Sequence, residues 1–239
     1  MKISILTIFP EMFEGFLTTS IIKKAILKEL VEVEMIDIRS FTKDKHNRVD
    51  DYPFGGGAGL VMMAQPVIDA INSCKVENSH VIYMTPVGHS FKQRIAKKFA
   101  GKSHLILLCG HYEGIDERIM PYVDECISIG DYVLTGGELA AMVVSDAVIR
   151  LQPGVITEDS IIDESYEDNL LEYPQYTRPA TYQGVDVPKV LLSGHHEEIR
   201  KWRLKQSLLR TKKFRPDLLE HRVFTKEERK LLDSADTDE

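Results

Sequence analysis

The chain has 239 residues, 43% of them hydrophobic, which is enough to bury the core of one large domain or of a domain with a smaller partner. Its net charge of −7 alone argues against a nucleic-acid-binding protein, and its three cysteines lack the spacing of a disulfide framework or a zinc site. These totals favour a cytoplasmic location. The first apolar run, residues 3–9, is too short for a signal peptide or a membrane span, so we expect no membrane partner.

Five apolar runs recur in the first part of the chain, with helical periodicity between most of them. The runs cover residues 3–9, 31–38, 80–85, 103–109 and 125–130. Near-continuous apolar runs that alternate with helices are typical of a parallel sheet covered on both faces. The sequence therefore predicts an α/β fold for this part.

The pattern changes after residue 137. The stretch ELAAMVVSDAVIRL predicts a long buried helix that ends near Pro153–Gly154. Amphipathic basic helices are predicted beyond residue 163, through to Leu232, which indicates a small all-helical C-terminal domain. We expect an α/β domain over 1–155, a linker over 156–163 and the helical domain over 164–239.

The charge is unevenly distributed along the chain. Residues 199–215 hold eight basic residues and no acidic one. A solvated helix face is the ordinary explanation of such a run. A basic segment in an acidic chain also indicates a contact with a polyanion.

Three glycine-rich stretches follow predicted strands. GGGAG (55–59) lacks the Gly-Lys-Ser/Thr of a phosphate-binding loop, and on its own it is typical of a mobile surface loop. The stretches 109–119 and 128–141 place glycines at the carboxyl ends of strands, where α/β proteins bind ligands. They predict a small-molecule pocket built mainly from backbone groups. The dinucleotide fingerprint GxGxxG is missing, which disfavours a Rossmann oxidoreductase.

Six blocks of the sequence closely resemble the bacterial TrmD family of tRNA (guanine-N1) methyltransferases, which modify the guanine at tRNA position 37. In chain order they are TIFPEMF, DKHNRVDDYPFGGGAGLVMMAQP, CGHYEGIDERI, IGDYVLTGGELAA, LLEYPQYTRP and LLSGHHEEIRKWRLKQSLLRT. The resemblance implies a SPOUT-class domain whose pocket is a deep trefoil knot. It also implies a homodimer with active sites at the subunit interface, and tRNA rather than DNA as the partner. Periodicity alone does not predict a knot, because true knots are very rare.

The reaction that the resemblance implies moves a methyl group from S-adenosylmethionine to guanine N1. That nitrogen carries a proton at neutral pH, so the reaction needs a base, and a cation near O6 stabilises the charge that develops there. The family's arginine corresponds to Arg150, which would otherwise be an ordinary arginine at a helix C-terminus. Its aspartate base corresponds to Glu164, with Asp163 as the alternative if the linker shifts its register; Asp168 could cap the next helix.

The resemblance also assigns the binding residues. Those implied for the cofactor are Tyr83, Pro86, Gly110, Tyr112, Ile129, Gly130, Asp131, Tyr132, Val133 and Leu134. Those expected for the substrate are Glu113 near the target base, with His46, Arg200, Lys201, Arg203 and Lys205 on the tRNA. Besides Glu164, which stands for the family's aspartate, two positions depart from the family pattern: His111 stands for arginine and His195 for asparagine.

The resemblance also implies magnesium as a cofactor, with no dedicated protein site in the sequence. The departures at Glu164 and His111 keep two alternatives in view, a related methyltransferase with another RNA target and a non-catalytic RNA-binding protein that retains the pocket.

Overall fold

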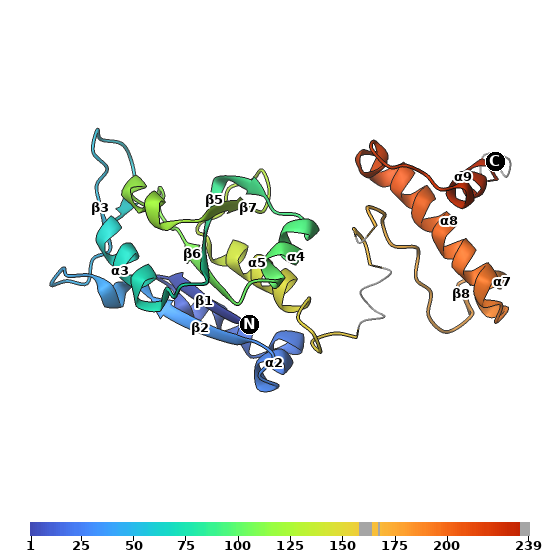
Figure 1. The fold of residues 1–239 in the computed structure, drawn as a ribbon, viewed down its shortest axis with the longest axis horizontal. Helices are drawn as coiled ribbons and strands as arrows, with labels where there is room; N and C mark the ends of the chain where they lie inside the picture. The colour runs from blue at the N-terminus through green and yellow to red at the C-terminus, as the bar shows by residue number, and fades with distance from the viewer. Residues whose placement is uncertain (158–163, 167, 235–239) are drawn as a thin grey trace. The chain divides into compact units, whose positions relative to one another are not determined.

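We describe the fold from a computed structural model of the chain, which covers residues 1–157, 164–166 and 168–234. The chain forms two compact units, Met1–Ile156 and Thr157–Glu239 (Figure 1). We call the first the sheet unit and the second the helical unit, and describe each separately.

The sheet unit is built on five parallel strands in the order β2-β1-β6-β5-β7. The strands are β1 (Lys2–Thr7), β2 (Glu32–Asp37), β5 (Ser79–Ser90), β6 (His104–Cys109) and β7 (Glu125–Ser128). Each lies on one of the five apolar runs, so the prediction of a parallel α/β sheet is confirmed. A two-stranded ribbon, β3 (Asp50–Asp51) with β4 (Val61–Met62), stands outside the sheet.

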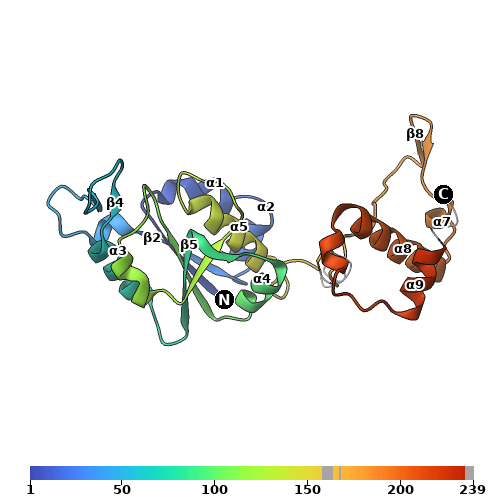
Figure 2. The same cartoon turned by 90° about the horizontal axis from the view of Figure 1, so that it is seen from above.

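Helices cover both faces of this sheet, as near-continuous apolar strands require. One face packs against α2 (Ser20–Leu27), α4 (Gln93–Ala100) and α5 (Glu138–Ile149), and α5 lies between the other two (Figures 1 and 2). The opposite face packs against α3 (Ala64–Cys74) with η2 (Ile38–Phe41) and η3 (Glu117–Tyr122). The remaining elements are η1 (Pro10–Phe13) and α1 (Glu14–Leu17). Successive side chains of β6 alternate between the two cores: Leu105 and Leu107 face the first, Ile106 and Leu108 the second.

The chain returns across the sheet after β7. That strand lies at the edge beyond β5, yet the loop that follows it reaches the end of β6, where Gly137 N donates to Gly110 O at 2.7 Å. His111 and Gly136 form an isolated antiparallel bridge at the same place. The loops after β6 and β7 therefore lie side by side at the carboxyl ends of the strands.

The helical unit is centred on α8 (His196–Phe214), a 19-residue helix that packs against α7 (Lys189–Leu192), η4 (Pro216–Leu219) and α9 (Lys226–Asp233). Leu208 and Thr211 of α8 are buried. Helix α9 begins with a capping box in which Thr225 and Glu228 bond each other's backbone amides. A short hairpin, β8 (Thr181–Tyr182) with β9 (Val185–Asp186), precedes α7, and helical periodicity does not predict it.

All three cysteines are free thiols. Among the described residues, no helix is both long enough and apolar enough to cross a bilayer.

Candidate active site

A cavity of about 300 Å³ opens at the carboxyl ends of β5, β6 and β7. Its walls come from β5, from the end of β7, from the loops after β6 and β7, and from the first turn of α5. The residues are Met84, Thr85, Pro86, Gly110, His111, Tyr112, Glu113, Gly114, Ile127, Ser128, Ile129, Gly130, Tyr132, Val133, Leu134, Thr135, Gly136, Gly137 and Ala140. Every residue predicted for the cofactor is among them except Tyr83 and Asp131.

Two glycines of this cavity, Gly137 and Gly110, pack closely against neighbouring residues. A Cβ at Gly137 would lie 2.9 Å from Cys109 Cα and 3.0 Å from Gly110 N, both of which are backbone atoms. A Cβ at Gly110 would lie 3.0 Å from the Tyr83 ring, so Tyr83 lies directly behind the cavity wall. Burial raises the pKa of the Tyr83 hydroxyl, which keeps it neutral.

A buried carboxylate lies beneath the cavity. Glu138, the first residue of α5, is 1% exposed and accepts a hydrogen bond from Thr7 Oγ1 at 2.8 Å. Its other oxygen lies 3.8 Å from His111 Nδ1, and the His111 ring also packs edge-on against Phe9 at 4.9 Å. Burial, followed by the charge of Glu138, raises the pKa of the Cys109 thiol well above its ordinary value.

Sequence reasoning did not select Thr7 or Glu138 as site residues. The signal for Glu138 was present, because it opens a helix whose first turns are otherwise apolar. A carboxylate placed at a buried helix N-terminus is stabilised by the helix dipole. Thr7 gave no signal, since it lies inside an apolar run.

The GGGAG loop meets the cavity loop at Glu113. Gly59 has φ +87°, and a Cβ there would lie 2.5 Å from Glu113 Oε1. The backbone joins the two loops as well, through Glu113 N to Leu60 O at 3.0 Å and Met62 N to Gly114 O at 2.9 Å. The C-terminal end of the glycine-rich stretch is therefore fixed to the rim of the cavity, which its composition did not predict.

His46 lies on the exposed loop that precedes the glycine stretch. Its backbone amide donates to Asp44 Oδ2 at 2.7 Å, and the Arg48 guanidinium bonds the same carboxylate at 2.8 Å. The Arg48 hydrogen bond, followed by that of the His46 amide, holds the pKa of Asp44 well below its ordinary range.

Glu164 belongs to the helical unit, where it lines a second cavity of about 540 Å³. The Arg203 guanidinium lines this cavity too and lies 4.7 Å from the centre of the Tyr173 ring. Arg200 also lines it and pairs with Glu197 at 2.8 Å and with Glu227 of α9. The structure thus brings Glu164, Arg200 and Arg203 together.

Acidic residues just outside the basic segment 199–215 pair with basic residues inside it. Lys201 lies 3.5 Å from Glu197, and Arg215 lies 2.6 Å from Asp217. Lys205 is partly buried on the same helix. The charge of the basic segment 199–215 is therefore partly balanced by acidic residues just outside it, Glu197 in the first turn of α8 and Asp217 after the helix.

Arg150 lies at the other end of α5 from the cavity. It is the C-cap of this 12-residue helix, whereas Glu138 begins the helix under the cavity. A rise of 1.5 Å per residue separates the two ends by about 18 Å. The structure does not bring Arg150 to the cavity of its own chain, and Asp163 lies outside the described residues.

No cluster of three or more histidine, cysteine, aspartate or glutamate side chains able to hold a metal occurs among the described residues. The possible magnesium requirement therefore stays a prediction.

The chain matches the family model described as tRNA (Guanine-1)-methyltransferase TrmD over residues 1–221. A tRNA (guanine-N(1)-)-methyltransferase of Clostridium botulinum (strain Langeland) is 54% identical to it over 234 residues, 97% of each chain. A protein of the same name from Dictyoglomus turgidum is 53% identical over 98% of this chain and 96% of its own. Another from Carboxydothermus hydrogenoformans is 55% identical over 97% of this chain and 92% of its own. With a glycine-walled cavity at the strand ends and this similarity along nearly its whole length, the chain belongs to the TrmD family of tRNA (guanine-1)-methyltransferases.

Proposed function

We propose that the protein transfers a methyl group from S-adenosylmethionine to N1 of the guanine at tRNA position 37. The observation that carries this proposal is the cavity at the carboxyl ends of β5, β6 and β7, in a chain of this family. Its walls are backbone-rich and include three adjacent apolar or aromatic side chains, Tyr132, Val133 and Leu134. Such a lining suits a nucleoside with an amino-acid tail, and when bound, this cofactor supplies an electrophilic methyl group.

The residues that would hold the cofactor are those that line the cavity. Pro86 and the run from Ile129 to Leu134 would bound it, and Gly110 and Gly137 would let it approach the backbone closely. We infer that the loops after β6 and β7 belong to the trefoil knot expected for the family. The return of the chain from β7 to the end of β6 supports that inference.

The carboxylate of Glu164 is proposed to take the N1 proton of guanine. A carboxylate suits this role because it is ionised at neutral pH. It can therefore accept the N1 proton while the methyl group bonds to N1. The Arg150 guanidinium is proposed to donate hydrogen bonds to O6, where negative charge develops. The target guanine must leave its stack to reach these groups, and Glu113 at the cavity rim would then lie beside it.

The active site is proposed to combine two subunits. Arg150 lies at the end of α5 that is far from the cavity, so a second copy of the chain is needed to supply it. The side chains of Leu139 and Val143, one turn apart on α5, are 48% and 47% exposed, and Val133 on the cavity loop is 91% exposed. Exposed apolar side chains of this kind suit an interface between copies.

The tRNA is proposed to contact the helical unit through α8, with Arg200, Lys201, Arg203 and Lys205. Arg200 and Lys201 would then exchange Glu197 for phosphate oxygens, so binding should weaken steeply as salt rises. His46 is proposed as a contact on the exposed loop of the sheet unit.

The test is single-turnover transfer of a labelled methyl group to an unmodified tRNA transcript with guanines at positions 36 and 37. We expect Glu164→Gln to slow transfer by about 10²-fold or more, because the base is lost, while Asp163→Asn stays near wild type. A transcript with adenine at position 37 is the substrate control. If only Asp163→Asn is slow, Asp163 is the base; cofactor binding without any transfer would support the non-catalytic alternative.

A further inference from the structure

Glu164 lies on a loop of the helical unit whose conformation is held from outside. We call residues 164–166 and 168–172 the Glu164 loop. Tyr166 has φ +74° and Asn169 has φ +53°, in the left-handed region that is unusual for a bulky residue such as tyrosine. Two bonds close the loop on itself, from Tyr166 N to Leu170 O at 2.8 Å and from Glu172 N to Ser165 Oγ at 3.0 Å. Such backbone geometry persists only where the surroundings fix it.

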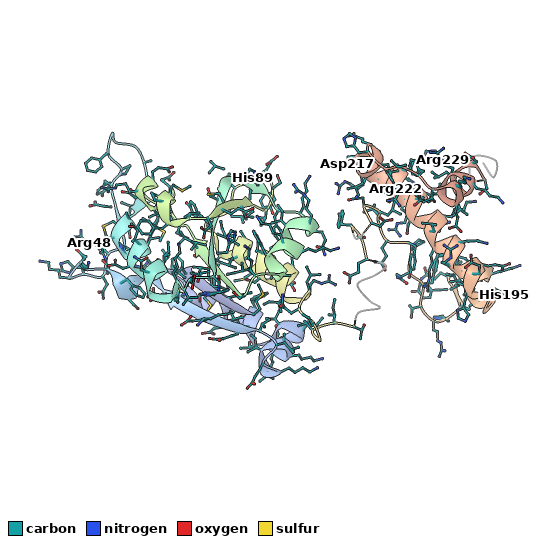
Figure 3. All side chains as sticks on the ribbon, viewed as in Figure 1. Arg48, His89, His195, Asp217, Arg222 and Arg229 are labelled. Atoms are coloured by element: carbon teal, nitrogen blue, oxygen red, sulfur yellow. The ribbon has the colours of Figure 1, made fainter. Side chains whose placement is uncertain are left out.

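Arg222 fixes the outer side of this loop. It follows η4 in the connection to α9 (Figure 3). Its Nη2 lies 2.7 Å from Asp168 Oδ2, and its Nη1 donates to the backbone carbonyl of the same residue. The Arg222 side chain is 12% exposed and that of Asp168 is 82% exposed. A largely buried arginine therefore holds one exposed loop residue by both its side chain and its backbone.

Arg222 is itself fixed to the body of the helical unit. Its Nη2 also donates to Glu228 Oε1 at 2.6 Å, and Glu228 Oε2 accepts the backbone amide of Thr225 at 2.7 Å. Glu228 is buried and belongs to the capping box of α9. The chain of contacts runs without a break from the N-terminus of α9 to the Glu164 loop.

The inner side of the loop rests on α8. Leu171 N donates to Thr211 Oγ1 at 2.8 Å, and Leu170 is buried. Both anchors are elements of the helical unit, and Asp168 lies four residues from Glu164. The loop that carries Glu164 is thus held on two sides by residues of its own unit.

We propose that Arg222 is a positioning residue for methyl transfer, which holds the Glu164 loop through Asp168 and is braced by Glu228. This proposal rests on the assignment of Glu164 as the base. It makes a specific claim about the reaction step: the contact should govern the rate of transfer and leave the affinity for tRNA unchanged. A carboxylate that moves by 1 Å can lose about 10²-fold in rate.

The first test is Asp168→Ala, because it leaves the pair of Arg222 with buried Glu228 intact and so preserves the fold. With saturating tRNA and cofactor in single turnover, we expect transfer to slow by about tenfold or more, with the Kd for tRNA within about twofold of wild type. Arg222→Lys should be intermediate, since one ammonium cannot hold two groups of Asp168 as a guanidinium does. Arg229→Met, which removes an exposed arginine of α9, is the matched control and should change neither quantity.

A double variant separates this proposal from the assignment of the base. In a Glu164→Gln background, Asp168→Ala should change the residual rate by less than about twofold, because no base is left to position. In the wild-type background, Asp168→Ala should lower the rate at every pH while the rising limb of the pH profile remains. Equal slowing in both backgrounds, or a loss confined to tRNA affinity, would overturn the proposal. A wild-type rate in Glu164→Gln alone would reject the base, and with it the positioning role.

Discussion

Gly137 is a position in the cavity wall that has room for glycine alone. A Cβ added there would lie within 3.0 Å of the backbone of Cys109 and Gly110, and the Gly137 amide donates to Gly110 O at 2.7 Å. Backbone atoms cannot turn aside as the end of a flexible side chain can, so a methyl group here must push two segments apart. The wall keeps its shape because nothing larger than hydrogen fits between them.

Gly137→Ala is therefore expected to weaken binding of S-adenosylmethionine by about tenfold or more, since the loops after β6 and β7 must separate. Isothermal titration calorimetry of the variant gives the Kd directly. Gly101→Ala is the control, because its new Cβ would lie 3.6 Å from the nearest atom, in ordinary contact, and should leave the Kd unchanged. An equal Kd for S-adenosylmethionine in the two variants would show that the cavity wall accommodates the added methyl group.

At the scale of elements, the amino ends of three strands meet around a buried histidine. His104, the first residue of β6, bonds Ser4 Oγ of β1 through Nε2 at 3.0 Å and Ser79 Oγ of β5 through Nδ1 at 2.8 Å. Ser4 in turn donates to Glu34 of β2. Burial lowers the pKa of His104, with the Lys2 charge adding to the effect, although Glu34 and Glu32 oppose it. The neutral ring thus links the strands.

A lowered pKa in the folded state makes stability depend on pH. The contribution of His104 is present above its ordinary value of 6.5 and is lost as the pH falls through 6.5 toward the folded value. We expect the sheet unit to lose stability from pH 7 to 5.5 more steeply in wild type than in His104→Gln, which cannot titrate. Urea titrations read by hydrogen exchange in β6 would measure the slopes, and equal slopes would contradict the prediction.

At the scale of the whole molecule, the two units divide the proposed reaction between them. The sheet unit holds the cavity, whereas the helical unit carries Glu164 and the basic residues of α8. Under this proposal the chemistry requires both units, and Arg150, at the far end of α5 from the cavity, must come from a second copy of the chain. The proposal therefore makes assembly of two copies a condition for activity.

Val143→Arg is expected to disrupt the proposed homodimer, because it places a charge on the exposed apolar face of α5. Light scattering after size-exclusion chromatography should show a monomer, with methyl transfer reduced by about 10²-fold or more since Arg150 is no longer supplied across the interface. Val76→Arg is the matched control, a 61% exposed valine just after α3, and should change neither mass nor rate. An unchanged mass in Val143→Arg would exclude this face as the interface.

The sequence predicted the sheet well, because each buried strand is a short apolar run between helical stretches. It did not predict the contact between Gly59 and Glu113, or the return of the chain to Gly110, since neither leaves a local pattern. The contact of Asp168 with Arg222 could not be predicted from a local sequence pattern either. The sequence context of Asp168 suggests a helix cap, but its partner Arg222 lies 54 residues later in the chain. Contacts between distant residues decide these positions, and periodicity reports only on near neighbours.

The late return of the chain from β7 also orders events during protein synthesis. A chain made from its N-terminus can pair β2, β1, β6 and β5 once residue 109 has left the ribosome. The cavity cannot exist until the loop ending at Gly137 has also emerged and reached Gly110. A nascent chain halted between these two points would hold most of a folded sheet and lack the proposed cofactor site.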